Sequence, residues 1–132
     1  MATTIKIAIP NRWYLVGFIC KWIIDNNVRY SNNITYINKM IHICCYQYRL
    51  ATNQLLISSK FQLYPNGYIA YDIHEMLLAV AKFDSNVSGF FSTNFYNSQQ
   101  IEPQIEKFLN QVLSYYKQYG IKRLIEISKS MT

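Results

Sequence analysis

The sequence predicts a mainly α-helical, compact single-domain bundle of about five helices, with a short extended segment near residues 57–68. Three observations predict this class. The chain has 132 residues, of which 51% are hydrophobic and 15% charged, so it can bury a core and is not generally disordered. Apolar residues recur at helical spacing in several stretches. Turn-forming prolines and glycines fall near the ends of these stretches.

The first predicted helix spans about residues 11–26, after Pro10 ends an extended segment. Its residues are apolar on nearly every side, so we expect a central, largely buried helix. Gly17 in its interior costs up to about 1 kcal/mol relative to alanine, which close packing against another helix would explain. Asn26 and Asn27 tolerate left-handed backbone and are expected to end the helix.

The second helix has the most regular pattern, because apolar residues form one continuous stripe from Ile34 to Tyr48. Asn33 or Thr35 can cap its N-terminus by accepting a backbone N–H bond. The following residues, QLLISSKFQLY, alternate enough to predict one or two short extended pieces. Pro-Asn-Gly at 65–67 predicts a turn, because proline fixes φ and asparagine or glycine accepts a positive φ.

A third helix is expected to place six apolar residues on one face: Ile69, Ile73, Met76, Leu77, Val80 and Phe83. Residues 84–98 lack such periodicity and are rich in Ser and Asn, which predicts a surface connection. Exposing its four aromatic residues would be costly, so we expect this connection to lie against the body or to join a binding surface.

A fourth helix is predicted to begin near Glu102 and Pro103, since proline is favoured at the first helical position. Gly120 is expected to end it in the left-handed conformation. A fifth helix follows directly, with Leu124, Ile125 and Ser128 facing inward.

The net charge of +6 is unevenly distributed. Residues 1–71 carry seven Lys or Arg against one acid, Asp25, whereas residues 72–132 carry six of each sign. The basic half could face an acidic protein, nucleic acid or an anionic membrane. However, Lys39 and Arg49 lie about 80° apart around one helix, and no single stripe forms. We therefore interpret these charges as solvated surface groups.

The sequence predicts no enzyme and no catalytic, cofactor or metal site. His42 is three residues from Cys45, and His74 is two from Asp72, but neither belongs to a nucleophile motif. No glycine-rich phosphate loop is present.

The three cysteines are interpreted as small apolar fillers in a reducing compartment. No signal peptide is apparent, and the most apolar run, residues 13–24, is too short to span a bilayer. These observations predict a cytoplasmic protein without membrane insertion.

Twelve tyrosines are present, and three of them surround the 65–67 turn. Tyrosine offers a large contact area with a polar tip, which suits protein interfaces, although each could also pack at the edge of a small core. We expect the partner-binding residues to be Tyr64, Pro65, Asn66, Gly67, Tyr68 and Tyr71.

Residues 38–77, NKMIHICCYQYRLATNQLLISSKFQLYPNGYIAYDIHEML, resemble the core of the Panacea (SocA-like) antitoxin family. There a helix of the pattern QKLLYYAQGWYLA leads to a segment like F-E-A-W-x-Y-G-P-V. The positions that carry this resemblance are Lys39, His42, Tyr48, Phe61, Tyr64 and Gly67. Tyr68 stands where the family has proline.

The later segment IEKFLNQVLSYYKQYGIKRLIEIS resembles the family's helix-Tyr-Gly-helix ending, with Ser128 and Lys129 in place of its closing Thr-His. The resemblance implies an antitoxin-like protein, borne by a phage or mobile element, that neutralises a protein toxin by direct binding. Two alternatives stay open. The basic half could serve a nucleic-acid-binding regulator, or the chain could be a mobile-element inhibitor of a host complex.

Overall fold

The computed structural model describes residues 12–131, so the expectations for Pro10 and Asn11 lie outside the described residues. The elements in chain order are α2 (Trp13–Asn26), the 3-10 helix η2 (Val28–Tyr30), α3 (Ile34–Thr52), β1 (Phe61–Tyr64), β2 (Gly67–Ala70), α4 (Tyr71–Ala81), α5 (Val87–Phe95), α6 (Pro103–Tyr116) and α7 (Ile121–Ser130). Over these residues the chain is mainly helical with a two-stranded sheet, which confirms the predicted class. These residues contain one α-helix more than the five that were predicted.

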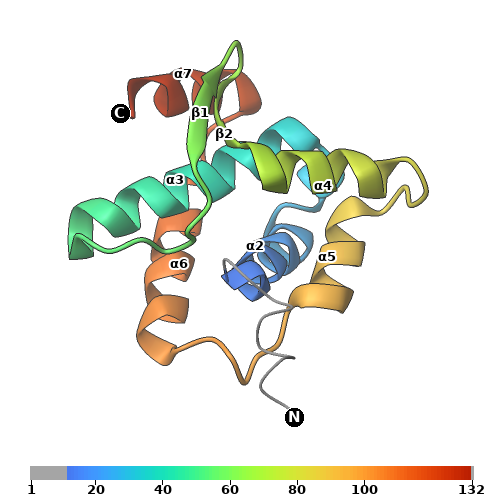
Figure 1. Ribbon diagram of the computed structural model, residues 1–132, viewed down its shortest axis with the longest axis horizontal. Coiled ribbons are helices and arrows are strands. Elements are labelled where there is room, and N and C mark those ends of the chain that lie inside the picture. Colours follow the sequence, from blue (N-terminus) through green and yellow to red (C-terminus); the bar gives the residue numbers. More distant parts are fainter. Residues whose placement is uncertain (1–11, 132) are drawn as a thin grey trace.

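Helix α3 crosses the middle of the molecule, with other elements above and below it (Figure 1). Every residue from 36 to 45 is buried, including the polar Asn38, Lys39 and His42. Helices α2, α4, α6 and α7 and strand β2 all contact it. The interpretation of Lys39 as a solvated surface charge is therefore wrong, because its helix is the centre of the fold.

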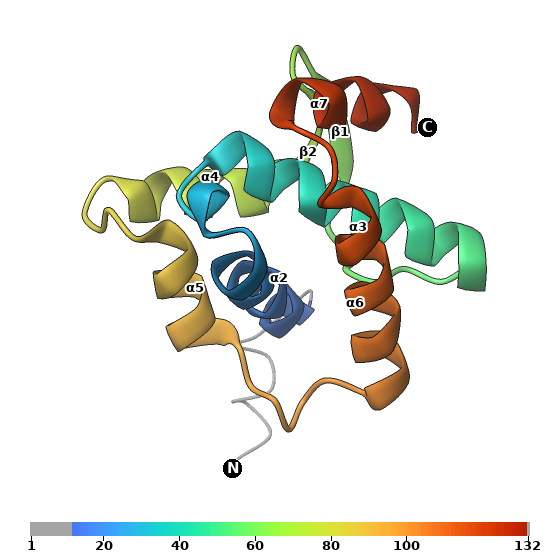
Figure 2. The ribbon, with the colours of Figure 1, turned by 180° about the vertical axis from the view of Figure 1, so that it is seen from behind.

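Helices α2 and α5 pack closely, and Figure 2 shows them side by side on one side of α3. A Cβ atom on Gly17 would lie 2.5 Å from the backbone nitrogen of Tyr96, just after α5. We predicted that Gly17 allows close packing against another helix, and this contact confirms the prediction.

Residues 84–98 do not form the irregular connection that was predicted, because they contain helix α5. The Asn86 side chain caps this helix by accepting the Gly89 N–H at 3.0 Å. The ring of Phe91 is fully buried, so the segment lies against the body as expected. Its period was missed because the helix is short and rich in Ser and Asn.

The extended segment is an antiparallel hairpin in which Phe61 pairs with Ala70 and Tyr64 with Gly67. Gly67 has φ +101°, which glycine adopts without strain, so the turn uses the expected residue. Ile69 was assigned to the third helix, but it lies in β2, and α4 begins only at Tyr71. Phe83 was assigned to the same apolar face, yet it follows the end of α4 and is 67% exposed.

One predicted helix end is confirmed by the structure, and two others differ from the prediction. Asn33 caps α3 as predicted, by accepting the Tyr36 N–H at 2.9 Å. Gly120 is not left-handed, with φ −79° and ψ 175°. Its carbonyl accepts the Leu124 N–H and opens α7, and a helix start requires extended backbone. Asn27, at the end of α2, is also not left-handed, with φ −154°.

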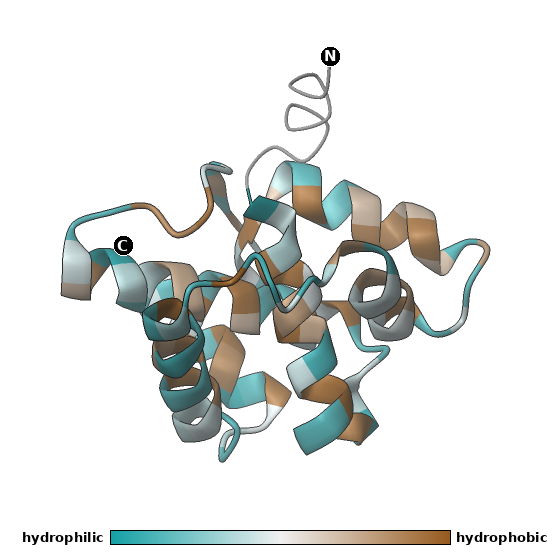
Figure 3. Cartoon of the chain, turned by 90° about the horizontal axis from the view of Figure 1, so that it is seen from below, coloured by the Kyte–Doolittle hydropathy of each residue, from teal (hydrophilic) through white to brown (hydrophobic). Residues whose placement is uncertain are grey.

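The helices carry apolar and polar stretches side by side, as amphipathic elements do (Figure 3). The three cysteines have free thiols and are buried, which agrees with their interpretation as apolar fillers. Burial raises the pKa of Cys20 and of Cys45 to about 12, so these thiols stay protonated and unreactive. Within residues 12–131, no helix combines the length and apolar character needed to cross a membrane.

Candidate functional site

The β1–β2 hairpin separates two hollows in the surface. The large hollow measures about 500 Å³ and is lined by His42, Cys45, Tyr46, Arg49, Leu50, Leu55, Leu56, Ile57, Ser59, Phe61, Tyr68 and Met131. The small hollow measures about 180 Å³ and is lined by Thr35, Asn38, Lys39, Tyr64, Pro65, Asn66, Ile69 and His74. One short hairpin therefore presents a different surface on each side.

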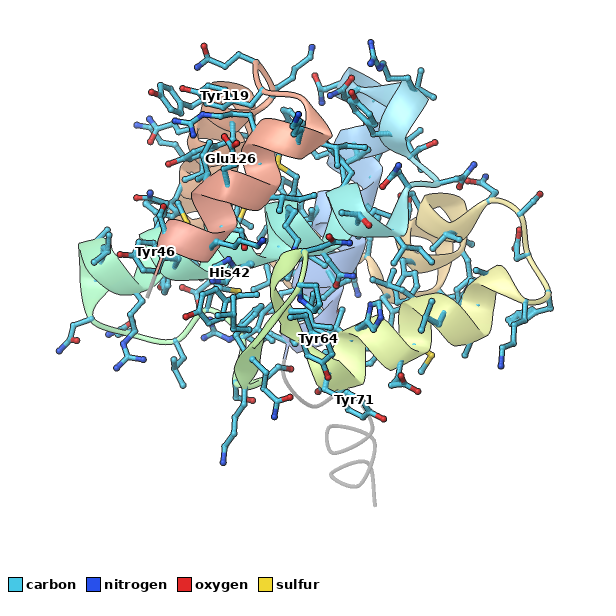
Figure 4. The ribbon with its side chains drawn as sticks, turned by 90° about the horizontal axis from the view of Figure 1, so that it is seen from above. His42, Tyr46, Tyr64, Tyr71, Tyr119 and Glu126 are labelled. Atoms are coloured by element: carbon cyan, nitrogen blue, oxygen red, sulfur yellow. The ribbon has the colours of Figure 1, made fainter. Side chains whose placement is uncertain are left out.

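Strand geometry explains this division, because successive side chains of a strand point to opposite faces. Leu63 is paired with Tyr68, so these two share one face, and Tyr64 lies on the other. The first face meets the large hollow and the second meets the small one. Figure 4 shows His42 and Tyr64 to either side of the hairpin.

Two helices hold the hairpin at Tyr68, close to its turn. From α3, the Lys39 ammonium donates to the Tyr68 carbonyl at 2.9 Å. From α7, the Ser128 hydroxyl accepts the Tyr68 N–H at 3.1 Å. Gly67 leaves room for both, since a Cβ atom there would lie 2.8 Å from the Ser128 Oγ and 3.0 Å from the Lys39 Nζ.

His42 extends this polar contact toward the large hollow. Its Nδ1 lies 2.9 Å from the Ser128 Oγ, and its ring stacks on that of Tyr68 with centroids 5.0 Å apart. Burial, followed by the nearby Lys39 charge, lowers the pKa of His42 to about 4, so the ring is neutral at pH 7. The Ser128 hydroxyl thus contacts both the Tyr68 N–H and the Nδ1 of His42.

Lys39 is a buried cation, with only 1% of its surface exposed. Burial lowers its pKa to about 8, and the positive charge of Lys129 makes a smaller contribution in the same direction. The ammonium is charged at pH 7, although its environment favours the neutral amine.

The small hollow has a polar wall made by two helices. The Asn38 amide nitrogen on α3 lies 2.9 Å from the Nδ1 of His74 on α4. Thr35 and Asn66 add further polar side chains, and the Lys39 side chain completes the lining. This arrangement can offer several hydrogen-bond donors beside one positive charge.

The six predicted site residues are divided by the fold. Tyr64, Pro65 and Asn66 line the small hollow, whereas Tyr68 lines the large one. Gly67 is buried and has a supporting role. Tyr71 is 53% exposed at the start of α4 and lines neither hollow.

Sequence reasoning did not identify Asn38, Lys39 and His42 as parts of this site. It compared each histidine with its neighbours along the chain, whereas the folded partners are Ser128 for His42 and Asn38 for His74. One signal could have found them, since the three polar residues lie within about 100° of each other on an otherwise apolar helix.

In the described part of the chain, no cluster of three or more His, Cys, Asp or Glu side chains could hold a metal ion. Comparison with protein-family models, with curated proteins and with solved structures gives no match for this chain.

Proposed function

We propose that this chain is an antitoxin-like protein of the cytoplasm that binds a partner toxin directly, through the hairpin and its two hollows. The observation that carries the proposal is a hairpin that is held by two helices near its turn and has exposed apolar side chains on it and just after it. Leu63 is 59% exposed and Tyr71 is 53% exposed, while Tyr68 is bonded to both Lys39 and Ser128.

A fixed hairpin is suited to binding because its conformation costs little entropy when a partner docks. Its exposed apolar side chains would provide the centre of the contact, with Asn66 and Gln62 at the polar rim. Several positions that carry the family resemblance lie in this hairpin or against it, namely Lys39, His42, Phe61 and Gly67, which supports the same assignment.

The mechanism would be steric: the hairpin side covers the active surface of the toxin. The excess of Lys and Arg in residues 1–71 would speed association with an acidic partner. We place the protein on a phage or mobile element on the strength of the family resemblance. An inhibitor of a host complex would use the same surface, and the identity of the partner distinguishes the two.

The test is affinity capture of the tagged chain from its own host after nuclease treatment, at moderate salt. We expect one stoichiometric protein that stops growth when expressed alone and is tolerated when this chain is co-expressed. A captured protein that is harmless alone would contradict the antitoxin assignment, and a host complex would favour the inhibitor.

A nucleic-acid-binding regulator is a second candidate, because Arg49 lines the large hollow and the exposed Lys60 lies beside β1. Salt response separates the candidates. The affinity for a nucleic acid would fall steeply with salt concentration as counterions are released, whereas a protein interface with an apolar centre would weaken much less.

A further inference from the structure

We propose that the small hollow binds a carboxylate, supplied by an aspartate or glutamate side chain of the partner protein. The inference rests on the proposed function and names the chemistry that one part of its surface recognises. Lys39 lines the hollow, and its ammonium would receive the carboxylate, with Asn38 and Asn66 as neighbouring polar groups.

The first argument is charge. An ammonium has three hydrogens to donate, and one of those of Lys39 goes to the neutral carbonyl of Tyr68. Among the described residues, no carboxylate contributes to the shift of its pKa, which comes from burial and from Lys129. The one acid of residues 1–71, Asp25, instead pairs with Lys21 at the surface. A buried cation without an anion is costly, so an incoming carboxylate would relieve it.

The second argument is size. The volume of about 180 Å³ lies below the range of roughly 300–1,000 Å³ that is typical of pockets for small molecules and cofactors. A single side chain from a docked surface suits such a space. Tyr64 and Pro65 form the side of the hollow that belongs to the hairpin, so a partner touching the hairpin tip would also reach the hollow.

The third argument separates carboxylate from nucleic-acid phosphate. Phosphate backbones are bound along open, extended basic grooves with several cations. Here a single lysine lines a small hollow together with Asn38, whose side-chain amide is bonded to His74. A carboxylate at the end of a side chain can enter this space more readily than a continuous phosphate backbone.

The experiment is a titration of the full chain, followed by the ¹H–¹⁵N resonances of the Asn38 and Asn66 side-chain amides. The probe is glutamate blocked at both backbone ends, and the matched control is glutamine blocked in the same way, at constant ionic strength. We expect saturable shifts with the glutamate probe and at least ten-fold weaker binding of the glutamine probe. Equal binding of both probes would overturn the proposal.

Two variants complete the test. Lys39→Met keeps the approximate length of the side chain and should weaken binding of the glutamate probe at least ten-fold. The control, Lys82→Met, removes an exposed charge after the end of α4 that does not contribute to the pKa of Lys39, and should change binding less than two-fold. Unchanged binding to Lys39→Met would contradict the site. If that variant does not fold, the pKa of Lys39 is measured in the native chain with and without the glutamate probe. A saturating concentration of the probe should raise this pKa, and an unchanged pKa would contradict the proposal.

The same titration is carried out with inorganic phosphate. If phosphate saturates the site at a lower concentration than the glutamate probe, the ligand is a phosphate and the carboxylate proposal is wrong. These titrations require no partner protein. They can therefore fail while a toxin is still captured, or succeed when no toxin is found, which keeps the two proposals separate.

Discussion

Lys39 places a charged group in the buried middle of helix α3. Its neighbours on both sides, Asn38 and Met40, are buried, and its ammonium is held by a backbone carbonyl of the hairpin. A fold that only needed stability would be better served by an apolar side chain at such a position. The retained charge is what we expect of a group that serves binding.

The burial of Lys39 predicts a stability that rises with pH. Its ordinary pKa of 10.5 falls to about 8 in the folded chain, so between these values the unfolded chain holds a proton that the folded chain has lost. The free energy of unfolding should therefore increase from pH 8 toward pH 10, by on the order of 2 kcal/mol from this group. Urea unfolding of the native chain and Lys39→Met measures the difference, because the cysteines and tyrosines are common to both. Parallel pH profiles would contradict the assignment.

The burial of His42 predicts a loss of stability at acidic pH. Its pKa falls from 6.5 to about 4 on folding, so the unfolded chain binds a proton more readily between these values and stability is lost as the pH drops. His42→Phe keeps a ring against Tyr68 and should flatten this acid-side loss by on the order of 2 kcal/mol. The variant also loses the bond to Ser128, which should cost about 1 kcal/mol at pH 7. Equal losses from pH 6.5 to pH 4 in both proteins would show that the ring is not buried as described.

At the scale of elements, the hairpin depends on Gly67. Its φ of +101° is strained for any side chain, and a Cβ atom would press on Ser128 and Lys39. Gly67→Ala should therefore lower the free energy of unfolding by roughly 1–3 kcal/mol. Gly120→Ala is the matched control, because no atom lies within 4 Å of the added carbon and φ is −79°. Thermal denaturation of both variants checks this, and a similar melting temperature for the two would argue against the described turn.

The sequence was sufficient for the strongly periodic elements and for the turn. The stripe from Ile34 to Tyr48 predicted α3, and Asn33 and Pro103 marked two helix starts correctly. It was not sufficient where tertiary contacts decide the local structure. Helix α5 packs against α2 and buries Phe91, which local propensity did not indicate. Gly120 was misassigned for a local reason, because it begins α7 instead of ending α6.

The site was only half predictable for the same reason. Tyr64, Pro65 and Asn66 could be identified because turn chemistry is local. The contacts of Lys39 with Tyr68 and of His42 with Ser128 join residues far apart in the chain, and their meeting depends on how β2 and α7 pack over α3.

At the scale of the whole molecule, the central α3 joins the core to the hairpin that we propose as the binding surface. Helices α2 and α6 pack on it, while the hairpin and α7 lie over its other side beside the C-terminal end of the described chain (Figure 1). The hairpin can thus present exposed side chains without weakening the core. Changes at its exposed edge should affect partner binding and leave the melting temperature nearly unchanged.

The most direct test of the account is the affinity of the captured partner for a hairpin variant, Leu63→Asp with Tyr71→Asp. The matched control is Phe83→Asp, which changes an equally exposed apolar residue beyond the far end of α4. We predict that calorimetry gives a Kd at least 100-fold weaker for the double variant and within two-fold of native for the control, with all melting temperatures similar. Equal affinities of the three proteins would contradict the assignment of the hairpin as the binding surface.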